Sequence, residues 1–279
     1  EVRRRRPSVV MVLGGYASAP CVAASVVLRI PLVVTEQNAR AGLANRIAGR
    51  FAQACAVPFT DTDLPRAVVT GNPVRDEILA VDRTRDRGQA RKSLGLPADA
   101  IVIGVYSGSL GSVRINEAVA ELAHRWVGRT DVAIRHVTGR RDFASIQAGA
   151  PGTDALHYQV VEYEDRVDLL LAAADLVVSR AGGNAVAELA QVGIGSILVP
   201  FPSATRDHQT ANAAALVSAG AAVLIADAEL DADRLEVELA PLLADPGRLD
   251  AMARSAASLA RPDAADRVAQ LLEEHARDR

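Results

Sequence analysis

The feature of this sequence that most constrains its fold is a regular alternation between short apolar runs and alanine-rich helical stretches. Ser8 to Leu13 is an apolar, β-branched run that ends at Gly14-Gly15, and a helical stretch follows from about Ala19 to Leu28. Pro31 to Thr35 repeats the strand pattern, and Ala44 to Ala54 repeats the helix pattern. Strands and helices that alternate at this spacing predict parallel sheets covered by helices, which is an α/β fold.

A change in composition near residues 72 to 76 predicts a domain boundary. After Gly71-Asn72-Pro73 the chain becomes strongly charged, and a long helix is expected from about Asp76 to Leu94. About three strands precede this point, the third at Ala67 to Thr70, and about six follow it. The later predicted strands are residues 101–106, 133–138, 158–161, 176–179, 196–200 and 222–225, and the later helices are residues 116–126, 166–174, 185–192, 210–219, 231–243, 246–260 and 263–276.

This strand count divides the chain unequally. A doubly wound sheet normally has about five or six strands, so the second domain fits a complete sheet and the first a truncated one. We divide the chain into residues 1–74, residues 75–260, and a last helix at residues 261–279 that is expected to pack back on the first domain. The chain also opens with Glu1 rather than Met, which suggests that further residues precede it.

Composition supports a two-domain protein with an aliphatic core. The 279 residues exceed the roughly 150 of one average domain, and 49% hydrophobic against 3% aromatic residues favours Ala, Val, Leu and Ile in the core. A net charge of -3 argues against a nucleic-acid partner. Cys21 and Cys55 stand apart and are expected to be buried, reduced thiols. No apolar run reaches the roughly 18 to 20 residues of a membrane span, so the chain is expected to lie on a membrane at most.

Two glycine-rich turns between a strand and a helix are candidate anion sites. Ser179 to Asn184 and Gly108 to Ser112 each place free N–H groups and the positive end of a helix dipole where a diphosphate can bind. Glu188, five residues into the first of these helices, is placed to accept hydrogen bonds from sugar hydroxyls. Tight packing alone also explains such glycines. Neither turn fits a triphosphatase loop or a dinucleotide-binding motif.

Further polar clusters follow other predicted strands. Asp207 to Asn212 lies where an open α/β sheet binds ligands, although Asp207 or Thr210 is equally suited to capping a helix. Glu36-Gln37-Asn38 follows a strand of the first domain, so a cleft between two sheets is the expected ligand site. Asp61-Thr62-Asp63 has the form of a metal-binding DxD triplet, but we interpret it as a chance triplet and expect no metal and no cofactor. Arg3 to Arg6 suits either lipid phosphates or a solvated helix end.

Six motifs together resemble one family. Gly14-Gly15-Tyr16, Glu36-Gln37-Asn38, Gly71 to Arg75, Gly108 to Gly111, Ser179 to Gly182 and Asp207 to Asn212 occur in the order seen in MurG, the bacterial UDP-N-acetylglucosamine:lipid I N-acetylglucosaminyltransferase of peptidoglycan synthesis. The resemblance implies a GT-B fold of two Rossmann-like domains with a cleft between them. It also implies inverting transfer of N-acetylglucosamine from UDP-N-acetylglucosamine to the lipid-linked muramyl-pentapeptide acceptor, forming lipid II. The acceptor and an anionic membrane surface would meet the first domain, at the cytoplasmic face of the cell membrane.

The same resemblance implies roles for individual residues. Glu188 would bond the ribose, and Gln209 with Asn212 would bind the sugar hydroxyls. Asn38 and Arg75 would complete the cleft from the other side, and uracil would meet the backbone near Tyr163 and Glu164. The residues implied for the diphosphate and its surroundings are Ser109, Gly111, Gly182, Gly183 and Asn184.

The sequence departs from the family pattern at several positions. The family begins with a GTGGH-like loop whose His is a candidate acceptor base, and nothing here matches it, which leaves Glu36 as a weak candidate. The chain as given is therefore expected to bind a UDP-sugar but to transfer it poorly. Thr35 replaces a His, Leu110 a Gln, and Asn184-Ala185 a Leu-Thr pair. These changes keep two alternatives open: a diverged GT-B transferase with another UDP-sugar or acceptor, and a sugar-nucleotide binding protein without turnover.

Overall fold

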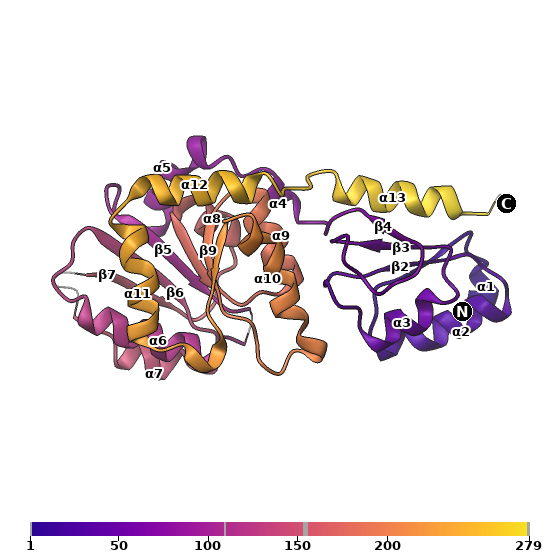
Figure 1. Cartoon of the computed structure of the whole chain (residues 1–279), viewed down its shortest axis with the longest axis horizontal. Coiled ribbons are helices and arrows are strands. Elements are labelled where there is room, and N and C mark those ends of the chain that lie inside the picture. The colour runs from indigo at the N-terminus through magenta and orange to yellow at the C-terminus, as the bar shows by residue number, and fades with distance from the viewer. Residues whose placement is uncertain (1, 109, 153–155, 278–279) are drawn as a thin grey trace.

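A computed structural model describes residues 2–108, 110–152 and 156–277, which form two α/β lobes side by side (Figure 1). The first sheet has the order β1-β2-β3-β4 and the second β10-β9-β8-β5-β6-β7, with every neighbouring pair parallel. The strands are β1 (Val10–Val12), β2 (Leu32–Thr35), β3 (Ala54–Val57), β4 (Ala67–Val69), β5 (Ile101–Tyr106), β6 (Val132–Val137), β7 (His157–Val161), β8 (Leu176–Ser179), β9 (Gly195–Leu198) and β10 (Ala222–Leu224). The predicted two-domain α/β architecture is confirmed.

Helices cover both faces of each sheet. They are α1 (Val2–Arg5), α2 (Ala19–Val27), α3 (Leu43–Gly49), α4 (Asp76–Leu79), α5 (Arg83–Leu94), α6 (Val113–Arg125), α7 (Phe143–Ala148), α8 (Val167–Ala173), α9 (Gly183–Val192), α10 (His208–Ser218), α11 (Ala232–Leu243), α12 (Pro246–Ala257) and α13 (Ala264–His275). In the second lobe α5, α8, α9 and α10 lie on one face and α6 and α11 on the other. Both faces being covered explains why the central strands β5 and β8 are nearly all apolar rather than alternating.

The last helix crosses from the second lobe to the first. After α12 the chain runs over to the first sheet, and α13 lies along it (Figure 1). Side chains of β2 alternate between the two faces: Leu32 and Val34 pack toward α2 and α3, whereas Val33 packs with Val268 and Leu271 of α13. The first sheet therefore has helices on both faces only because the C-terminus returns to it.

Local structure differs from the sequence-based expectation in three places. The helix expected to reach Ala54 ends at Gly49, and Ala54–Val57 is instead a fourth strand, buried between β2 and β4. Small residues buried on both faces show neither a helical nor an alternating period, so the pattern could not separate the two structures. The charged helix predicted over residues 76–94 breaks before Asp82, whose carboxylate caps α5 by accepting hydrogen bonds from the N–H groups of Thr84 and Arg85. Helix α7 was not predicted.

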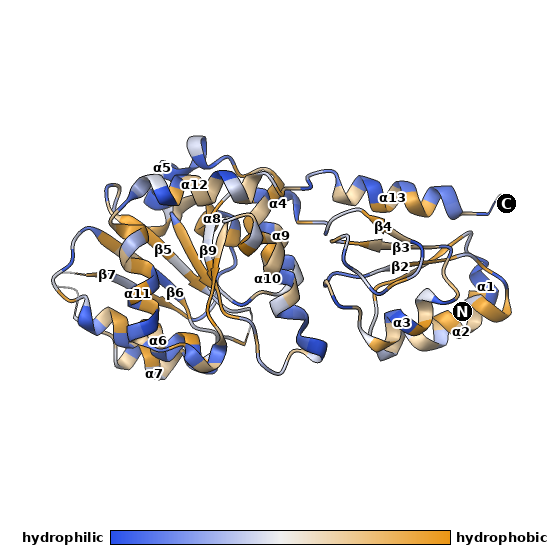
Figure 2. Cartoon of the chain, in the orientation of Figure 1, coloured by the Kyte–Doolittle hydropathy of each residue, from blue (hydrophilic) through white to orange (hydrophobic). Residues whose placement is uncertain are grey.

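The expectation of two buried thiols is wrong for one of them. Cys21 is exposed on α2, whereas Cys55 is buried in β3, and burial raises the pKa of the Cys55 thiol to about 11. Figure 2 shows hydrophobic residues along α2, and Val26 and Val27 of this helix are exposed, so hydrophobic surroundings in the sequence did not indicate burial.

Replacing Leu271 by Ala is expected to lower the free energy of unfolding by about 2 kcal/mol, because it removes buried apolar atoms and leaves a cavity under α13. Urea unfolding followed by circular dichroism measures this. Glu273→Ala, exposed on the same helix, is the control and should change stability by less than about 0.5 kcal/mol. An unchanged midpoint for Leu271→Ala would mean that α13 does not stabilise the first lobe.

Candidate functional site

A cavity of about 690 Å³ lies at the carboxyl ends of the strands in the second sheet. It opens where the strand order reverses, because β5 and β8 are neighbours although the chain passes through β6 and β7 between them. Loops on the two sides of such a reversal diverge, so open parallel sheets bind ligands there. Four of the residues expected to bind substrate line this cavity: Gly111, Gly182, Glu188 and Gln209.

Two helices begin at the cavity and present their N-termini to it. Gly182 is the N-cap of α9, and a side chain there would meet nothing within 4 Å, so this turn is open to a ligand. Ser112 is the N-cap of α6, where its Oγ accepts a hydrogen bond from the Ile115 N–H. The first N–H groups of a helix have no partner within it and carry partial positive charge, and Arg114 and Arg141 add full charges to the lining. This arrangement suits a diphosphate.

The sequence analysis missed Arg180, which organises the cavity floor. One guanidinium nitrogen donates to the carbonyls of Val199 and Pro200, both at 3.0 Å, and the other donates to Ser112 Oγ at 2.6 Å. An Asp227 oxygen lies 2.6 Å away, and the guanidinium stands 5.5 Å from the centre of the Phe201 ring. Arg180 thus ties the loops after β5, β8 and β9 together. Its place directly after a strand was visible in the sequence, but its partners were not.

Glu188 and Asp227 are the two carboxylates of the cavity lining, and Asp227 is paired with Arg180, so Glu188 is the one considered for a ligand. Its side chain is 13% exposed, and Oε1 lies 3.3 Å from Nη2 of Arg75. Burial raises the pKa of Glu188, and the nearby Arg75 opposes this shift. Because the Arg75 side chain is 55% exposed, the ion pair is weak and can be exchanged for hydroxyl donors of a sugar. Across the cavity, Gln209 Oε1 accepts a hydrogen bond from the Phe201 N–H at 2.9 Å, which fixes its orientation.

Glu36 shapes the first lobe's loop. It is 7% exposed, and its carboxylate accepts five hydrogen bonds. The donors are the N–H groups of Gln37, Asn38 and Gly42 and the side-chain amides of Asn38 and Asn45. Both carboxylate oxygens thus accept hydrogen bonds from this loop, and Glu36 holds the Glu36-Gln37-Asn38 turn. Its role as acceptor base stays a prediction.

Asn212 joins the two lobes. It is fully buried, its Nδ2 donates to Asn38 Oδ1 and to the Ala181 carbonyl at 3.0 Å, and its Oδ1 accepts from the Ala39 N–H at 2.7 Å. In the structure the two side chains are hydrogen-bonded to each other at the lobe interface, and their contact with the substrate stays a prediction.

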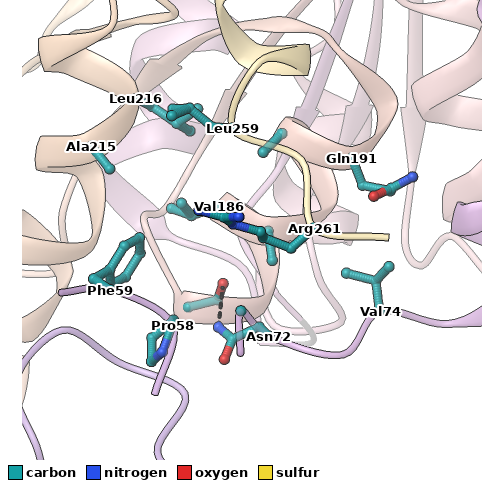
Figure 3. A pocket seen from close by; sticks show the side chains of 14 residues that line it. Pro58, Phe59, Asn72, Val74, Val186, Gln191, Ala215, Leu216, Leu259 and Arg261 are labelled. Carbon is teal, nitrogen blue, oxygen red and sulfur yellow. Dashed lines mark hydrogen bonds between the residues drawn. The ribbon is translucent and has the colours of Figure 1, made fainter. Parts of the chain in front are cut away.

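Gly183 also lies at that interface. A Cβ there would stand 2.0 Å from the Gln37 carbonyl oxygen, so only glycine permits this approach. Asn72 Nδ2 donates to the carbonyls of both Gln37 and Gly183, the second of which Figure 3 draws as a dashed line. The pocket beside it, lined by Phe59, Val186 and Arg261 among others, measures about 50 Å³, which is far too small for a nucleotide.

Other residues expected at the site lie elsewhere. Glu164 is 8% exposed and pairs with Arg135 at 2.7 Å, outside the cavity lining. Asn184 is exposed and is likewise not part of the lining. Ser109 lies outside the described residues.

A second contact crosses between the lobes from the turn before α10. Arg206, in a left-handed backbone conformation with φ of 58°, donates to the Ala41 carbonyl and lies 2.6 Å from Asp63 Oδ2. Burial tends to raise the pKa of Asp63, but hydrogen bonds from Arg206 and the Ala41 N–H outweigh it, so the pKa lies below its usual value. Asp61 lies 3.4 Å from Arg40. The two carboxylates of the DxD triplet thus have arginine partners.

Comparison with known proteins decides the family. The glycosyltransferase family 28 N-terminal domain matches residues 2–57, and the family 28 C-terminal domain matches residues 102–268. A UDP-N-acetylglucosamine--N-acetylmuramyl-(pentapeptide) pyrophosphoryl-undecaprenol N-acetylglucosamine transferase of Nocardioides sp. is 44% identical over 269 residues, which are 96% of this chain and 73% of that protein. This chain belongs to the MurG family of glycosyltransferases. A relative with the same name from Alkalilimnicola ehrlichii is 42% identical over 99% of this chain and 76% of its own length.

Solved structures agree with membership of the MurG family. The crystal structure of Acinetobacter baumannii MurG has a TM-score of 0.82 at 29% identity and covers 98% of this chain and 75% of its own. A Staphylococcus aureus MnaA structure with UDP has a TM-score of 0.71 at 16% identity, covering 98% and 77%. At that identity the second likeness concerns the fold alone. The GT-B fold expected from the resemblance is thereby confirmed.

Asn212→Ala is expected to lower the free energy of unfolding by about 1 to 3 kcal/mol, because it leaves the buried Ala39 N–H without a partner. Asp63→Asn, at the more exposed crossing, should lower it by about 1 kcal/mol or less. The Asp63 contribution, whose folded pKa is depressed, is present above the ordinary Asp pKa and disappears as the pH falls through the lowered value. Urea unfolding at pH 7 and at pH 3 checks both variants. Unchanged stability of Asn212→Ala would show that its hydrogen bonds do not stabilise the lobe interface.

Proposed function

We propose that this chain transfers N-acetylglucosamine from UDP-N-acetylglucosamine to the lipid-linked muramyl-pentapeptide acceptor with inversion, forming lipid II for peptidoglycan. The observation that carries the proposal is the 690 Å³ cavity at the reversal of the second sheet, with two helix N-termini and the carboxylate of Glu188 on its wall. The name of the Nocardioides relative supports the donor and the acceptor.

The geometry suits the departure of UDP. In inverting transfer a sugar hydroxyl of the acceptor attacks the anomeric carbon while the bond to the diphosphate breaks, so negative charge grows on the diphosphate. The N-termini of α6 and α9, with Arg114 and Arg141, stabilise that charge from fixed positions. Glu188 accepts hydrogen bonds from the ribose, which places the nucleotide so that its diphosphate meets these helix ends. Gln209, which also lines the cavity, is the residue we assign to the transferred sugar.

Glu188→Ala is expected to weaken UDP binding by about 1.5 to 3 kcal/mol, the effect of losing hydrogen bonds to a charged acceptor. Titration calorimetry with UDP measures this, with Glu273→Ala as a surface-carboxylate control that should bind like the wild type. Glu188→Gln, which keeps one accepting oxygen, should lose less. Unchanged UDP affinity in a folded Glu188→Ala variant would remove Glu188 from the ribose site.

The first lobe carries a surface that fits a membrane. Among the described residues no helix has the length and apolar character needed to cross a bilayer. An apolar groove of about 410 Å³ nevertheless lies between α2 and α3, and Val27, Leu43 and Phe51 on it are 79%, 55% and 51% exposed. Exposed Arg29 and Arg50 follow directly after these helices. Apolar side chains flanked by arginines favour insertion at an anionic membrane surface, so we place the protein peripherally at the cytoplasmic face, where its acceptor is anchored.

Val27→Asp combined with Phe51→Asp is expected to reduce binding to vesicles containing phosphatidylglycerol by at least about tenfold, because two exposed apolar side chains are lost from the contact. Co-sedimentation with vesicles checks this. Vesicles of phosphatidylcholine alone should bind the wild type weakly. Equal sedimentation of wild type and double variant would contradict the membrane assignment while leaving the donor site untouched.

A further inference from the structure

A chain of buried polar side chains lies behind the cavity, between β6, β7 and α6. His136 of β6 is fully buried, with Nδ1 2.8 Å from the Tyr158 hydroxyl and Nε2 3.0 Å from Asn116 Oδ1. Asn116, also buried, donates from Nδ2 to the Thr138 carbonyl at 2.9 Å and to Asp142 Oδ2 at 2.8 Å. None of these residues lines the cavity itself.

The protons in this chain have one consistent arrangement. A backbone carbonyl and an ionised carboxylate only accept hydrogen bonds, so the Asn116 amide nitrogen must face Thr138 and Asp142, and its oxygen must face His136. Hydrogen bonding to Arg141 keeps the pKa of Asp142 below its usual value, so it is ionised near neutral pH. Since an amide oxygen only accepts, the proton of His136 is on Nε2.

The other ring nitrogen then completes the chain. Burial lowers the pKa of His136 to about 3, so the ring is neutral and carries a single N–H. With that proton on Nε2, Nδ1 accepts a hydrogen bond from the Tyr158 hydroxyl. Hydrogen bonds run in one direction, from Tyr158 through His136 to Asn116 and on to the turn at residues 138–142.

The two groups to which Asn116 donates, the Thr138 carbonyl and the Asp142 carboxylate, both contact residues that line the cavity. A Cβ at Gly111, which has φ of 73°, would stand 1.8 Å from the Thr138 oxygen, so the turn after β5 rests directly on the carbonyl that Asn116 holds. Asp142, the second group that Asn116 holds, pairs at 2.8 Å with Arg141, which lines the cavity. A shift of Asn116 would therefore move the backbone at Gly111 and the charge of Arg141 together.

We propose that His136 and Asn116 are positioning residues for the diphosphate of the donor. The Nε2–H of His136 fixes the Asn116 amide, and this amide fixes the Gly111 turn and Arg141 at the spacing a diphosphate needs. Neither residue touches the donor. The inference rests on the proposed donor site and adds the groups that hold it in shape.

A matched pair of substitutions at His136 tests the direction of the hydrogen bonds. Glutamine places an amide nitrogen near the position of Nε2 and can still donate to Asn116, whereas asparagine reaches only the position of Nδ1. Calorimetry measures the affinities for UDP and for uridine. The UDP affinity divided by the uridine affinity gives the contribution of the diphosphate to binding. We expect this ratio to fall about tenfold in His136→Asn, because the hydrogen bond to Asn116 is lost. In His136→Gln the hydrogen bond is kept, and the ratio should fall less than about threefold.

Tyr158→Phe is the control at the far end of the chain. It removes the hydrogen bond to Nδ1 but leaves the one from Nε2 to Asn116, so thermal stability should fall while the UDP-to-uridine ratio stays at the wild-type value. A wild-type ratio in both His136 variants would show that the chain supports only the fold. Equal loss in both variants would show that the Nε2 proton is not the cause. Either result overturns the inference.

A measurement on the unaltered protein keeps the inference testable if a variant fails to fold. Nitrogen-15 NMR of labelled histidine should show the His136 ring neutral between pH 5 and 8 and protonated on Nε2. A ring protonated on Nδ1, or titration of His136 in this range, contradicts the arrangement. If the wild type binds uridine as tightly as UDP, the proposed diphosphate site itself fails and this inference falls with it.

Discussion

The close approach of two backbones, Gly183 of the second lobe and Gln37 of the first, is the contact on which the relation between the lobes depends. The position of a Gly183 side chain is already taken by the Gln37 carbonyl, and the Asn72 amide bonds the carbonyls of both residues. One face of the turn that starts α9 is therefore buried against the first lobe, while Gly182, one residue earlier, is open to the cavity. The same turn joins the lobes and offers the helix N-terminus to a ligand.

The proposed donor cavity has a local charge pattern of its own, although the whole chain carries only -3. Its lining holds Arg114, Arg141 and two helix N-termini together with the carboxylates of Glu188 and Asp227, and Asp227 is paired with Arg180. Arg180 is different in kind, because its donors are occupied by the Val199 and Pro200 carbonyls and by Ser112. It shapes the floor, whereas Arg114 and Arg141 have exposed side chains on the lining, the second of them also paired with Asp142. Near-zero net charge thus says little about a local site.

The sequence identified the turns of the site better than the roles of their side chains. Gly111, Gly182, Glu188 and Gln209 were named from their motifs and do line one cavity. Glu36 and Asn212 were named from equally good motifs, yet their hydrogen bonds hold the loop and the lobe interface. Motif spacing places a residue at the carboxyl end of a strand, but burial and partners come from segments far away: Asn212 bonds Ala39, 173 residues earlier.

What the sequence by itself determined is the order of strands and helices, their parallel pairing and the turns at which a ligand can bind, because these follow from local period and turn chemistry. Even so, it missed β3, where a run of small apolar residues fits a buried strand as well as a helix. Only the tertiary structure decided which polar side chains remain available, because that depends on long-range partners. It alone showed that Arg180 braces three loops and that His136 is held neutral behind the cavity. The return of the last helix to the first domain was expected from the sequence, but its contacts with Val33 of β2 were not.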